Sequence, residues 1–184
     1  MRSEKTEDMI LCAMFVALIA AGAFIKIPVP VVPFTLQYLF TMLAGLLLGG
    51  RKGCFAVCVY ILLGLVGLPI FTQGGGIGYI FQPSFGYIIG FAAGAFVTGT
   101  IANKKHQPGY GRLLVANFVG LGIVYLFGMV YYYLISNFYL ENPIGLWPLF
   151  LYCFLLAVPG DILLCIIGAI IGRRMIPLIQ EGRL

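Results

Sequence analysis

Long apolar segments, separated by short polar or glycine- and proline-rich stretches, dominate the chain. A bilayer core of about 30 Å is crossed by roughly 17 to 25 residues of helix. Six segments reach or approach this length, although the second is shorter and the sixth is interrupted by Pro159. They cover residues 9–25, 36–49, 52–68, 84–102, 113–135 and 146–172. The pattern predicts an all-α, polytopic membrane protein with six transmembrane helices, in which residues 1–184 form a single membrane domain.

The composition supports this interpretation. Hydrophobic residues make up 61% of the chain, charged residues only 9%, and the mean hydropathy is +1.05. Soluble domains carry about 25% charged residues. The five cysteines are odd in number and lie in or beside apolar segments, so neither a disulfide framework nor a zinc site fits them. We expect them to be small buried side chains, and we predict no metal and no cofactor.

The basic residues predict the orientation in the membrane. Six spans place both termini on one side, and cytoplasmic loops collect Lys and Arg. With a cytoplasmic N-terminus, every Lys and Arg except Lys26 falls on the inner side. The stretch Ala21-Gly22-Ala23 resembles a signal-peptide cleavage site, but cleavage there would leave five spans and spoil this bias. Because the basic residues form no stripe on one face, we predict no binding of nucleic acid.

Asp161 is the one acidic residue inside an apolar segment, in the stretch AVPGDILLC. An ionisable group at membrane depth costs at least about 2.5 kcal/mol, so it is a candidate functional group by default. The alternative is a structural role at a helix start, since Pro159 and Asp161 both suit a first turn. Arg173 follows Asp161 by twelve positions, and this spacing predicts a carboxylate in the outer half of the bilayer.

Two segments on the predicted outer side have unusual compositions. Residues 26–37, KIPVPVVPFTLQ, contain three prolines and are expected to form a stiff, extended lid. Residues 67–87 combine aromatic side chains with a run of three glycines flanked by Gln73 and Gln82. Glycine lets main-chain N–H groups approach a ligand, and aromatic rings offer apolar walls. An interfacial aromatic belt is the alternative, but it does not explain the glycine run, so we predict a binding loop.

Small residues recur at four-residue spacing in three segments, which favours close approach of helices. The stripes are Ala13, Ala17 and Ala21; Gly86, Gly90 and Gly94; and Gly168 and Gly172. Internal packing is the expected role of each. The alanine stripe could face a partner helix only if the first segment lies at the edge of the bundle, which the sequence does not determine.

Catalytic motifs are missing from the sequence. The stretch GLLLGGRKG lacks the spacing and the Ser or Thr of a phosphate-binding loop. Ser84 and Ser136 have no histidine partner at membrane depth, and a single intramembrane acid offers little for an ion relay. We therefore do not expect the chain to be an enzyme.

Three of these features together resemble the BioY family, the substrate-capturing subunits of energy-coupling factor (ECF) biotin transporters. They are PVPVVPFTLQ, then GLPIFTQGGG leading to PSFGYIIGF, and finally PGD, and the resemblance covers about residues 9–175. It implies a six-helix protein of the bacterial plasma membrane that binds biotin from outside. It also implies two kinds of partner, a transmembrane coupling subunit and a pair of ATPase subunits, and docking of the coupling subunit on the alanine stripe.

The resemblance also suggests residue roles. Asp161 matches a family ligand residue, which would accept hydrogen bonds from the ureido N–H groups of biotin. The candidate ligand-binding residues are Asp161, Gln73, Gly74, Gly75, Gly76, Tyr79, Gln82, Ser84, Phe34 and Lys26. The candidate docking residues are Ala13, Ala17 and Ala21.

Two departures from the family pattern concern the ligand. Leu164 stands where many members have Lys, and Gln82 to Tyr87 read QPSFGY where many have GPTGGY. The cation that would face the carboxylate of biotin is therefore missing; Lys26 is the candidate substitute, or the carboxylate stays hydrated. An S-component for riboflavin or thiamin is an alternative, because a lone Asp suits a positively charged ligand. A channel or structural membrane subunit, which needs no ligand, is another.

Overall fold

The computed structural model describes residues 2–27, 34–105, 107–140 and 143–181. Helices dominate it: α1 (Arg2–Phe24), α2 (Gln37–Leu48), α3 (Gly50–Leu65), α4 (Phe85–Ala102), α5 (Tyr110–Phe138), α6 (Leu146–Phe150) and α7 (Val158–Glu181). Shorter elements are a 3-10 helix, η1 (Ile77–Phe81), a π-helical stretch, η2 (Leu151–Leu155), and the strands β1 (Lys26–Ile27) and β2 (Phe34–Thr35). The all-α prediction is confirmed, with one two-residue antiparallel pair added.

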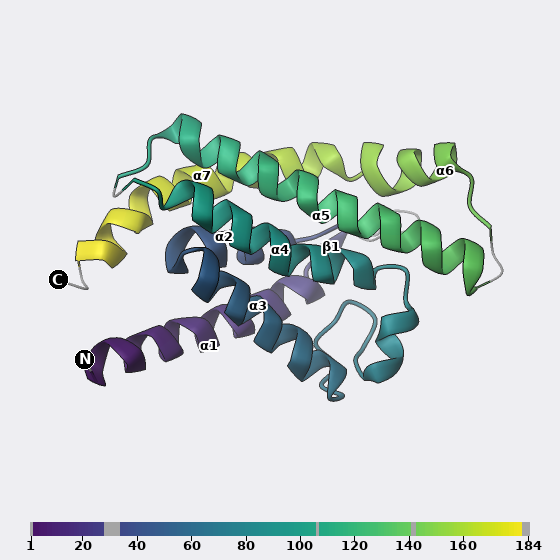
Figure 1. Ribbon diagram of the computed structural model, residues 1–184, viewed down its shortest axis with the longest axis horizontal. Coiled ribbons are helices and arrows are strands. Elements are labelled where there is room, and N and C mark those ends of the chain that lie inside the picture. Colours follow the sequence, from purple (N-terminus) through teal and green to yellow (C-terminus); the bar gives the residue numbers. More distant parts are fainter. Residues whose placement is uncertain (1, 28–33, 106, 141–142, 182–184) are drawn as a thin grey trace.

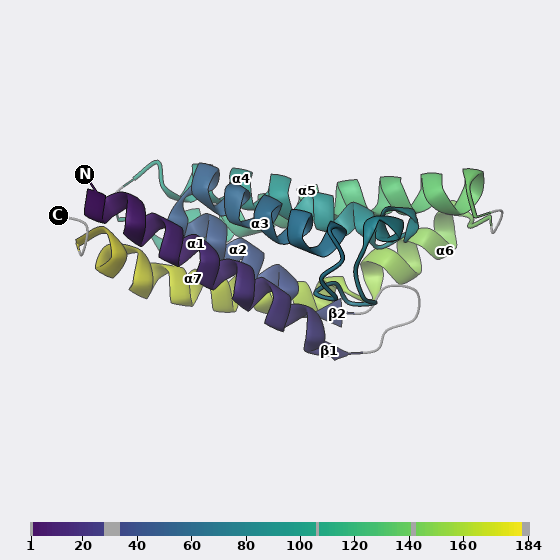
Figure 2. The same ribbon diagram turned by 90° about the horizontal axis from the view of Figure 1, so that it is seen from below.

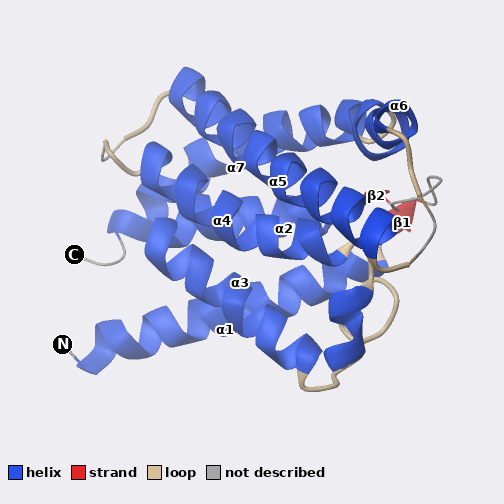
Figure 3. Ribbon diagram, turned by 45° about the vertical axis from the view of Figure 1, so that its right-hand side comes forward, coloured by secondary structure: helices blue, strands red, loops and turns tan. Residues whose placement is uncertain are grey.

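The long helices form an elongated bundle in which α4 is central. α4 packs against α5, α2 and α3, while α1 packs against α2 and α3, and α7 against α5 and α2 (Figure 1). The N-terminus and the C-terminus lie at the same end of the bundle (Figure 2). The opposite end carries β1, β2, η1 and α6 (Figure 3).

All six apolar segments of the sequence are helical. Among the described residues, four stretches are long and apolar enough to cross a membrane: Lys5–Phe24, Phe85–Ala102, Tyr110–Phe138 and Leu146–Ile179. α2 has only 12 residues and α3 has 16, which is short for a 30 Å core. The count of six spans therefore stays a prediction.

The sixth segment bends where its sequence predicts a helix start. The chain turns at Leu156 and Ala157, and α7 begins at Val158 with Pro159 in its first turn. Proline suits this position because its missing N–H would have no partner there. α6 and η2 precede the bend and lie beside the C-terminal part of α5 (Figure 1). Asp161 is thereby placed in the first turn of α7, next to this bend.

The three stripes of small residues have different surroundings. Gly86, Gly90 and Gly94 are buried against α5, and Gly168 and Gly172 pack against side chains of α2. Both glycine stripes therefore serve internal packing. Ala13, Ala17 and Ala21 are all exposed on the outside of α1.

Candidate functional site

A cavity of about 70 Å³ lies between the ends of the helices that are remote from the termini. This volume has room for several water molecules or part of a small ligand. Its walls come from the beginnings of α2, α4 and α7, the middle of α5, η2, and the segment between α3 and α4. The lining residues are Thr35, Gln37, Tyr38, Thr72, Tyr79, Ser84, Tyr87, Ile88, Phe91, Val124, Tyr125, Cys153, Ala157 and Asp161.

Asp161 is the acidic group of this cavity. The side chain is buried, with 9% of its residue surface exposed, and Oδ2 accepts a hydrogen bond of 2.5 Å from the hydroxyl of Tyr125. Within the part of the chain that the structure describes, Asp161 forms no ion pair and accepts no second hydrogen bond. A carboxylate offers about four lone-pair positions. Acceptor capacity therefore remains for a ligand that brings N–H or O–H groups.

A second polar wall is formed by three hydroxyl groups. Tyr79 is buried, and its Oη lies 2.9 Å from Thr72 Oγ1 and 3.3 Å from Ser84 Oγ. Between the two polar walls, the lining includes apolar side chains from α4 and α5, among them Phe91 and Val124. The cavity can thus hold a ligand that has polar groups at its edge and an apolar body.

Three tyrosines of the lining connect the helices around the cavity. Tyr38 Oη donates to the main-chain oxygen of Asn117 at 3.0 Å, which joins α2 to α5. Tyr87 Oη donates to the main-chain oxygen of Cys153 at 3.1 Å, which joins α4 to η2. Tyr125 joins α5 to α7 through Asp161. These bonds use polar groups that would otherwise be buried without partners, so they hold the cavity walls in one arrangement.

The structure places the sequence-predicted residues at three kinds of position. Asp161, Tyr79 and Ser84 line the cavity. Lys26 lies at its edge: the residue pairs with Thr35 of the lining, and Nζ donates to the main-chain oxygen of Thr72 at 3.4 Å. Phe34 belongs to β2, but its side chain, like residues 28–33 of the expected lid, lies outside the described part of the chain.

The glycine run and its flanking glutamines do not line the cavity. Gln73 and Gln82 are exposed and absent from its lining, as are Gly74, Gly75 and Gly76. The glycines have a structural explanation. Gly74 has a φ of 118°, which side chains disfavour, and a Cβ on Gly75 would collide with the main-chain oxygen of Leu68. The run therefore folds the loop that carries Thr72 and Tyr79 to the cavity.

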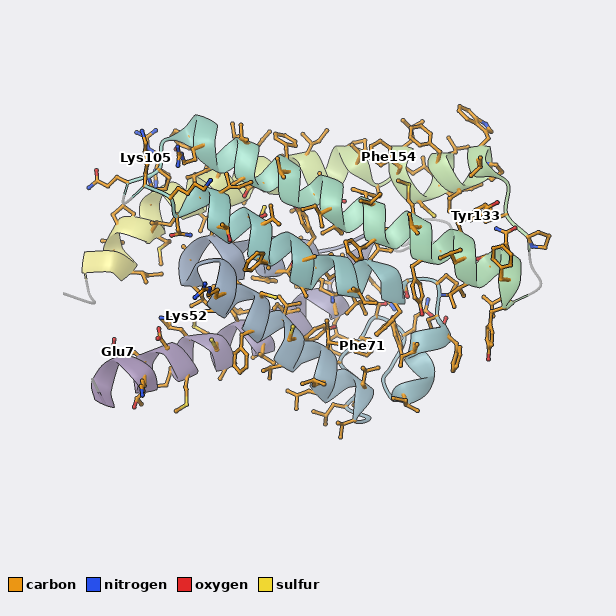
Figure 4. The ribbon with its side chains drawn as sticks, viewed as in Figure 1. Glu7, Lys52, Phe71, Lys105, Tyr133 and Phe154 are labelled. Carbon is orange, nitrogen blue, oxygen red and sulfur yellow. The ribbon has the colours of Figure 1, made fainter. Side chains whose placement is uncertain are left out.

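The same loop is anchored by an aromatic cluster. Phe71, which is 1% exposed, packs edge-on against the ring of Tyr60 and lies 4.5 Å from the ring of Tyr79, between centroids. Figure 4 shows Phe71 between α3 and this loop. Packing of these rings fixes Tyr79 at the cavity wall.

Sequence reasoning did not single out several polar lining residues of the apolar helices, among them Gln37, Tyr38 and Tyr125. Gln37 is a polar residue at the start of an apolar segment, and it is 2% exposed. Tyr125 stands in the middle of the segment 113–135, where an interfacial tyrosine is not expected. These polar side chains in apolar segments are the sequence signals that could have identified the two residues. Leu164, which stands where many BioY members have Lys, is buried in the core and does not line the cavity.

Comparison with known proteins places this cavity in a family context. The sequence model of the BioY family matches residues 1–181. A probable biotin transporter BioY from Lysinibacillus sphaericus is 44% identical over 183 residues, covering 100% of this chain and 93% of that protein. The biotin transporter BioY of Thermotoga maritima is 41% identical over 136 residues, covering 73% of this chain and 77% of that protein.

A solved structure supports the same assignment. The crystal structure of the S-component for biotin from an ECF-type ABC transporter superposes with a TM-score of 0.79 at 29% identity. The match covers 95% of this chain and 93% of that one. From the family match, the sequence identities and this fold, the chain belongs to the BioY family.

Proposed function

We propose that this chain captures biotin as the S-component of an ECF-type transporter. Its relatives are named biotin transporters, and the matching solved structure is an S-component for biotin. The observation in this chain that carries the proposal is Asp161: a buried carboxylate in a cavity, with Tyr125 as its one side-chain donor among the described residues.

Biotin suits the chemistry of this cavity. The ureido ring of biotin carries two N–H donors, and Asp161 can accept one of them as a charge-assisted hydrogen bond strengthened by the exclusion of water. The sulfur-containing ring is apolar and matches the apolar side chains of the lining. Tyr79 and Ser84, which line the second polar wall, can bond the ureido oxygen.

Lys26 is the proposed partner of the biotin carboxylate. Its Nζ bonds to the main-chain oxygen of Thr72, so the ammonium group stands beside the cavity lining. The other ligand-binding candidates from the sequence, Gln73, Gln82 and Gly74 to Gly76, lie outside the cavity lining. Phe34 stays a candidate of the lid segment.

The proposed assembly places the chain as a single domain in a bacterial plasma membrane, with both termini cytoplasmic. Two basic side chains support this orientation, because Lys52 and Lys105 lie toward the end of the bundle that carries the termini (Figure 4). A transmembrane coupling subunit and two ATPase subunits would supply the energy, since the sequence has no phosphate-binding loop. The exposed alanine stripe of α1 is the proposed docking face.

Replacement of Asp161 tests the ligand site. Asp161→Asn keeps the size of the side chain but removes charge and one acceptor oxygen. Loss of a charged hydrogen bond weakens binding by about 1.5 to 3 kcal/mol, so we expect biotin affinity to fall roughly 10- to 150-fold in isothermal calorimetry of the detergent-purified protein. Glu7→Gln, which removes an exposed carboxylate near the N-terminus, is the matched control and should leave affinity unchanged. Unchanged affinity in Asp161→Asn would remove this residue from the site.

The identity of the ligand has a separate test. Native mass spectrometry of the protein purified from a biotin-producing host should show a bound species with the mass of biotin. A bound species with the mass of riboflavin or thiamin would show that this vitamin, and not biotin, is the ligand. A protein that carries and binds none of the three would instead favour a structural membrane subunit.

A further inference from the structure

A chain of two hydrogen bonds connects the cavity to the loop that follows α3. Gln37, at the start of α2, lines the cavity, and its Nε2 donates to Tyr60 Oη at 3.1 Å. Tyr60, on α3, donates in turn to the main-chain oxygen of Ile70 at 2.8 Å. Tyr60 is fully buried and does not itself line the cavity. It can therefore influence a ligand only through its neighbours.

The chemistry of Tyr60 determines which way the Gln37 amide points. A phenol hydroxyl has a single proton. The main-chain oxygen of Ile70 can only accept, so this proton is used there. Tyr60 Oη is then left as an acceptor toward Gln37, and the amide must present its NH₂ group to it. The reversed amide would place two oxygen acceptors against each other with no proton between them.

The amide oxygen of Gln37 is left with acceptor capacity. No described residue donates a hydrogen bond to Gln37 Oε1. Within the described part of the chain, Asn117 Oδ1 is the side-chain atom that is both sealed from surrounding space and without a partner. Gln37 Oε1 is therefore not sealed, and the open space that Gln37 adjoins is the cavity.

We propose that Tyr60 is a positioning residue that turns the amide oxygen of Gln37 toward the bound ligand. The cavity then has two acceptors from different helices, Gln37 Oε1 on α2 and the carboxylate of Asp161 on α7. Such a pair selects a ligand that carries two N–H donors, and it disfavours ligands that present only acceptors at this position. This inference rests on the proposed function, in which the ureido group of biotin supplies the two donors.

A double-mutant cycle tests whether Tyr60 acts through Gln37. Tyr60→Phe keeps the ring that packs against Phe71 but removes the hydroxyl, so the amide can reverse. We expect biotin affinity, measured by calorimetry, to fall about 5- to 10-fold in Tyr60→Phe and by a similar or larger factor in Gln37→Leu. The double variant should bind no more weakly than Gln37→Leu alone. If the two effects multiply instead, Tyr60 does not act through Gln37 and the inference is overturned.

Tyr131 provides a matched control. Its hydroxyl also donates to a main-chain oxygen near the cavity, that of Ile80 in η1, and its ring packs against Phe85. However, Tyr131 does not bond to any side chain of the cavity lining. Tyr131→Phe should change biotin affinity less than 2-fold. An equal loss in Tyr131→Phe and Tyr60→Phe would show that both act only by loosening the segment that carries Tyr79, which contradicts the inference.

Ligand analogues test the amide oxygen without relying on the folding of Tyr60→Phe. Biotin derivatives methylated at one or the other ureido nitrogen each lack one donor, and both should bind the unmodified chain more weakly than biotin does. In Gln37→Leu, one of the two derivatives should lose no further affinity relative to biotin. If both keep their full penalties, Gln37 accepts from neither nitrogen, and the inference fails while the binding of biotin stands. If the unmodified chain binds no biotin at all, the proposed function itself fails.

Discussion

Two stripes of small residues, one on α4 and one on α1, have the same four-residue spacing but opposite surroundings in the structure. Gly86, Gly90 and Gly94 on α4 are buried against α5. Ala13, Ala17 and Ala21 on α1 are all exposed. Small-residue spacing thus identifies faces that another helix can approach closely, but it does not say whether that helix belongs to the same chain.

The position of α1 explains the exposure of its stripe. The residues of α1 that pack into the core also repeat every four positions: Phe15, Ile19 and Ala23 are 3%, 0% and 0% exposed. These residues are offset by two positions from the alanine stripe, and two residues of helix turn about 200°. The alanines therefore lie on the opposite side of the helix. The small outer face is not needed for the packing of α1 against α2 and α3, which leaves it available for a partner.

The glycine stripe should tolerate substitution least. A Cβ at Gly90 would stand 2.9 Å from Val124 Cα and 3.0 Å from its main-chain oxygen, and backbone atoms cannot rotate away. We expect Gly90→Leu to destabilise the bundle by about 3 kcal/mol or more, because overpacking would push α4 and α5 apart. The yield of monodisperse protein and its thermal melting followed by circular dichroism measure this effect.

A glycine of α5, the helix that packs against Gly90, provides the control. Gly122 on α5 is exposed, and a Cβ there would meet no heavy atom within 4 Å. Gly122→Leu should leave folding unchanged or improve it slightly, since leucine is the better helix former. Equal losses of stability in Gly90→Leu and Gly122→Leu would contradict this explanation. They would mean that glycine matters for the flexibility of these helices and not for the close contact of α4 with α5.

Substitutions on the two faces of α1 should also differ in their effect on stability, although by less than those at Gly90 and Gly122. Ala23 is fully buried, so Ala23→Leu inserts a larger side chain into filled space. We expect a loss of about 1 to 3 kcal/mol, read as a lower melting temperature. Ala21→Leu, two positions earlier and exposed, should melt within experimental error of the unmodified chain. A reversed order would contradict the placement of α1 in the bundle.

These contrasts show what the sequence can determine about the fold. The six apolar segments predict the helices closely, since main-chain hydrogen bonds in lipid must be satisfied within the segment. The predicted segment 113–135 became a helix three residues longer at each end, Tyr110–Phe138, because a helix does not have to end where the apolar stretch ends. Neighbour relations were not predictable. Both stripes have the same four-residue spacing, and only the position of α1 at the edge of the bundle leaves its stripe exposed.

The site was partly predictable for a related reason. Asp161 stands out in sequence because a lone acid at membrane depth is costly, and Tyr79 and Ser84 stand out in an unusual loop. Tyr125 and Gln37 belong to apolar helices, and their role depends on which helix face meets the cavity. The interpretation of the glycine run was only partly useful. The conformation of Gly74 and the tight packing at Gly75 position the loop. The exposed Gln73 and Gln82, however, are not part of the cavity lining.

The smallest effect on the isolated chain, and the sharpest test of the alanine stripe, comes from Ala17→Trp. Ala17 is exposed in the middle of the stripe, so an indole there meets detergent or lipid and should change stability by less than about 0.5 kcal/mol and leave biotin affinity intact. A partner helix that packs on the stripe, however, would be held away by the indole. We therefore expect co-purification with the coupling and ATPase subunits to fail. Val115→Trp, at a 57% exposed position of α5, adds the same side chain elsewhere and should assemble normally. If Ala17→Trp also assembles normally, the exposed stripe faces lipid, and the four-residue spacing on α1 has no partner to explain it.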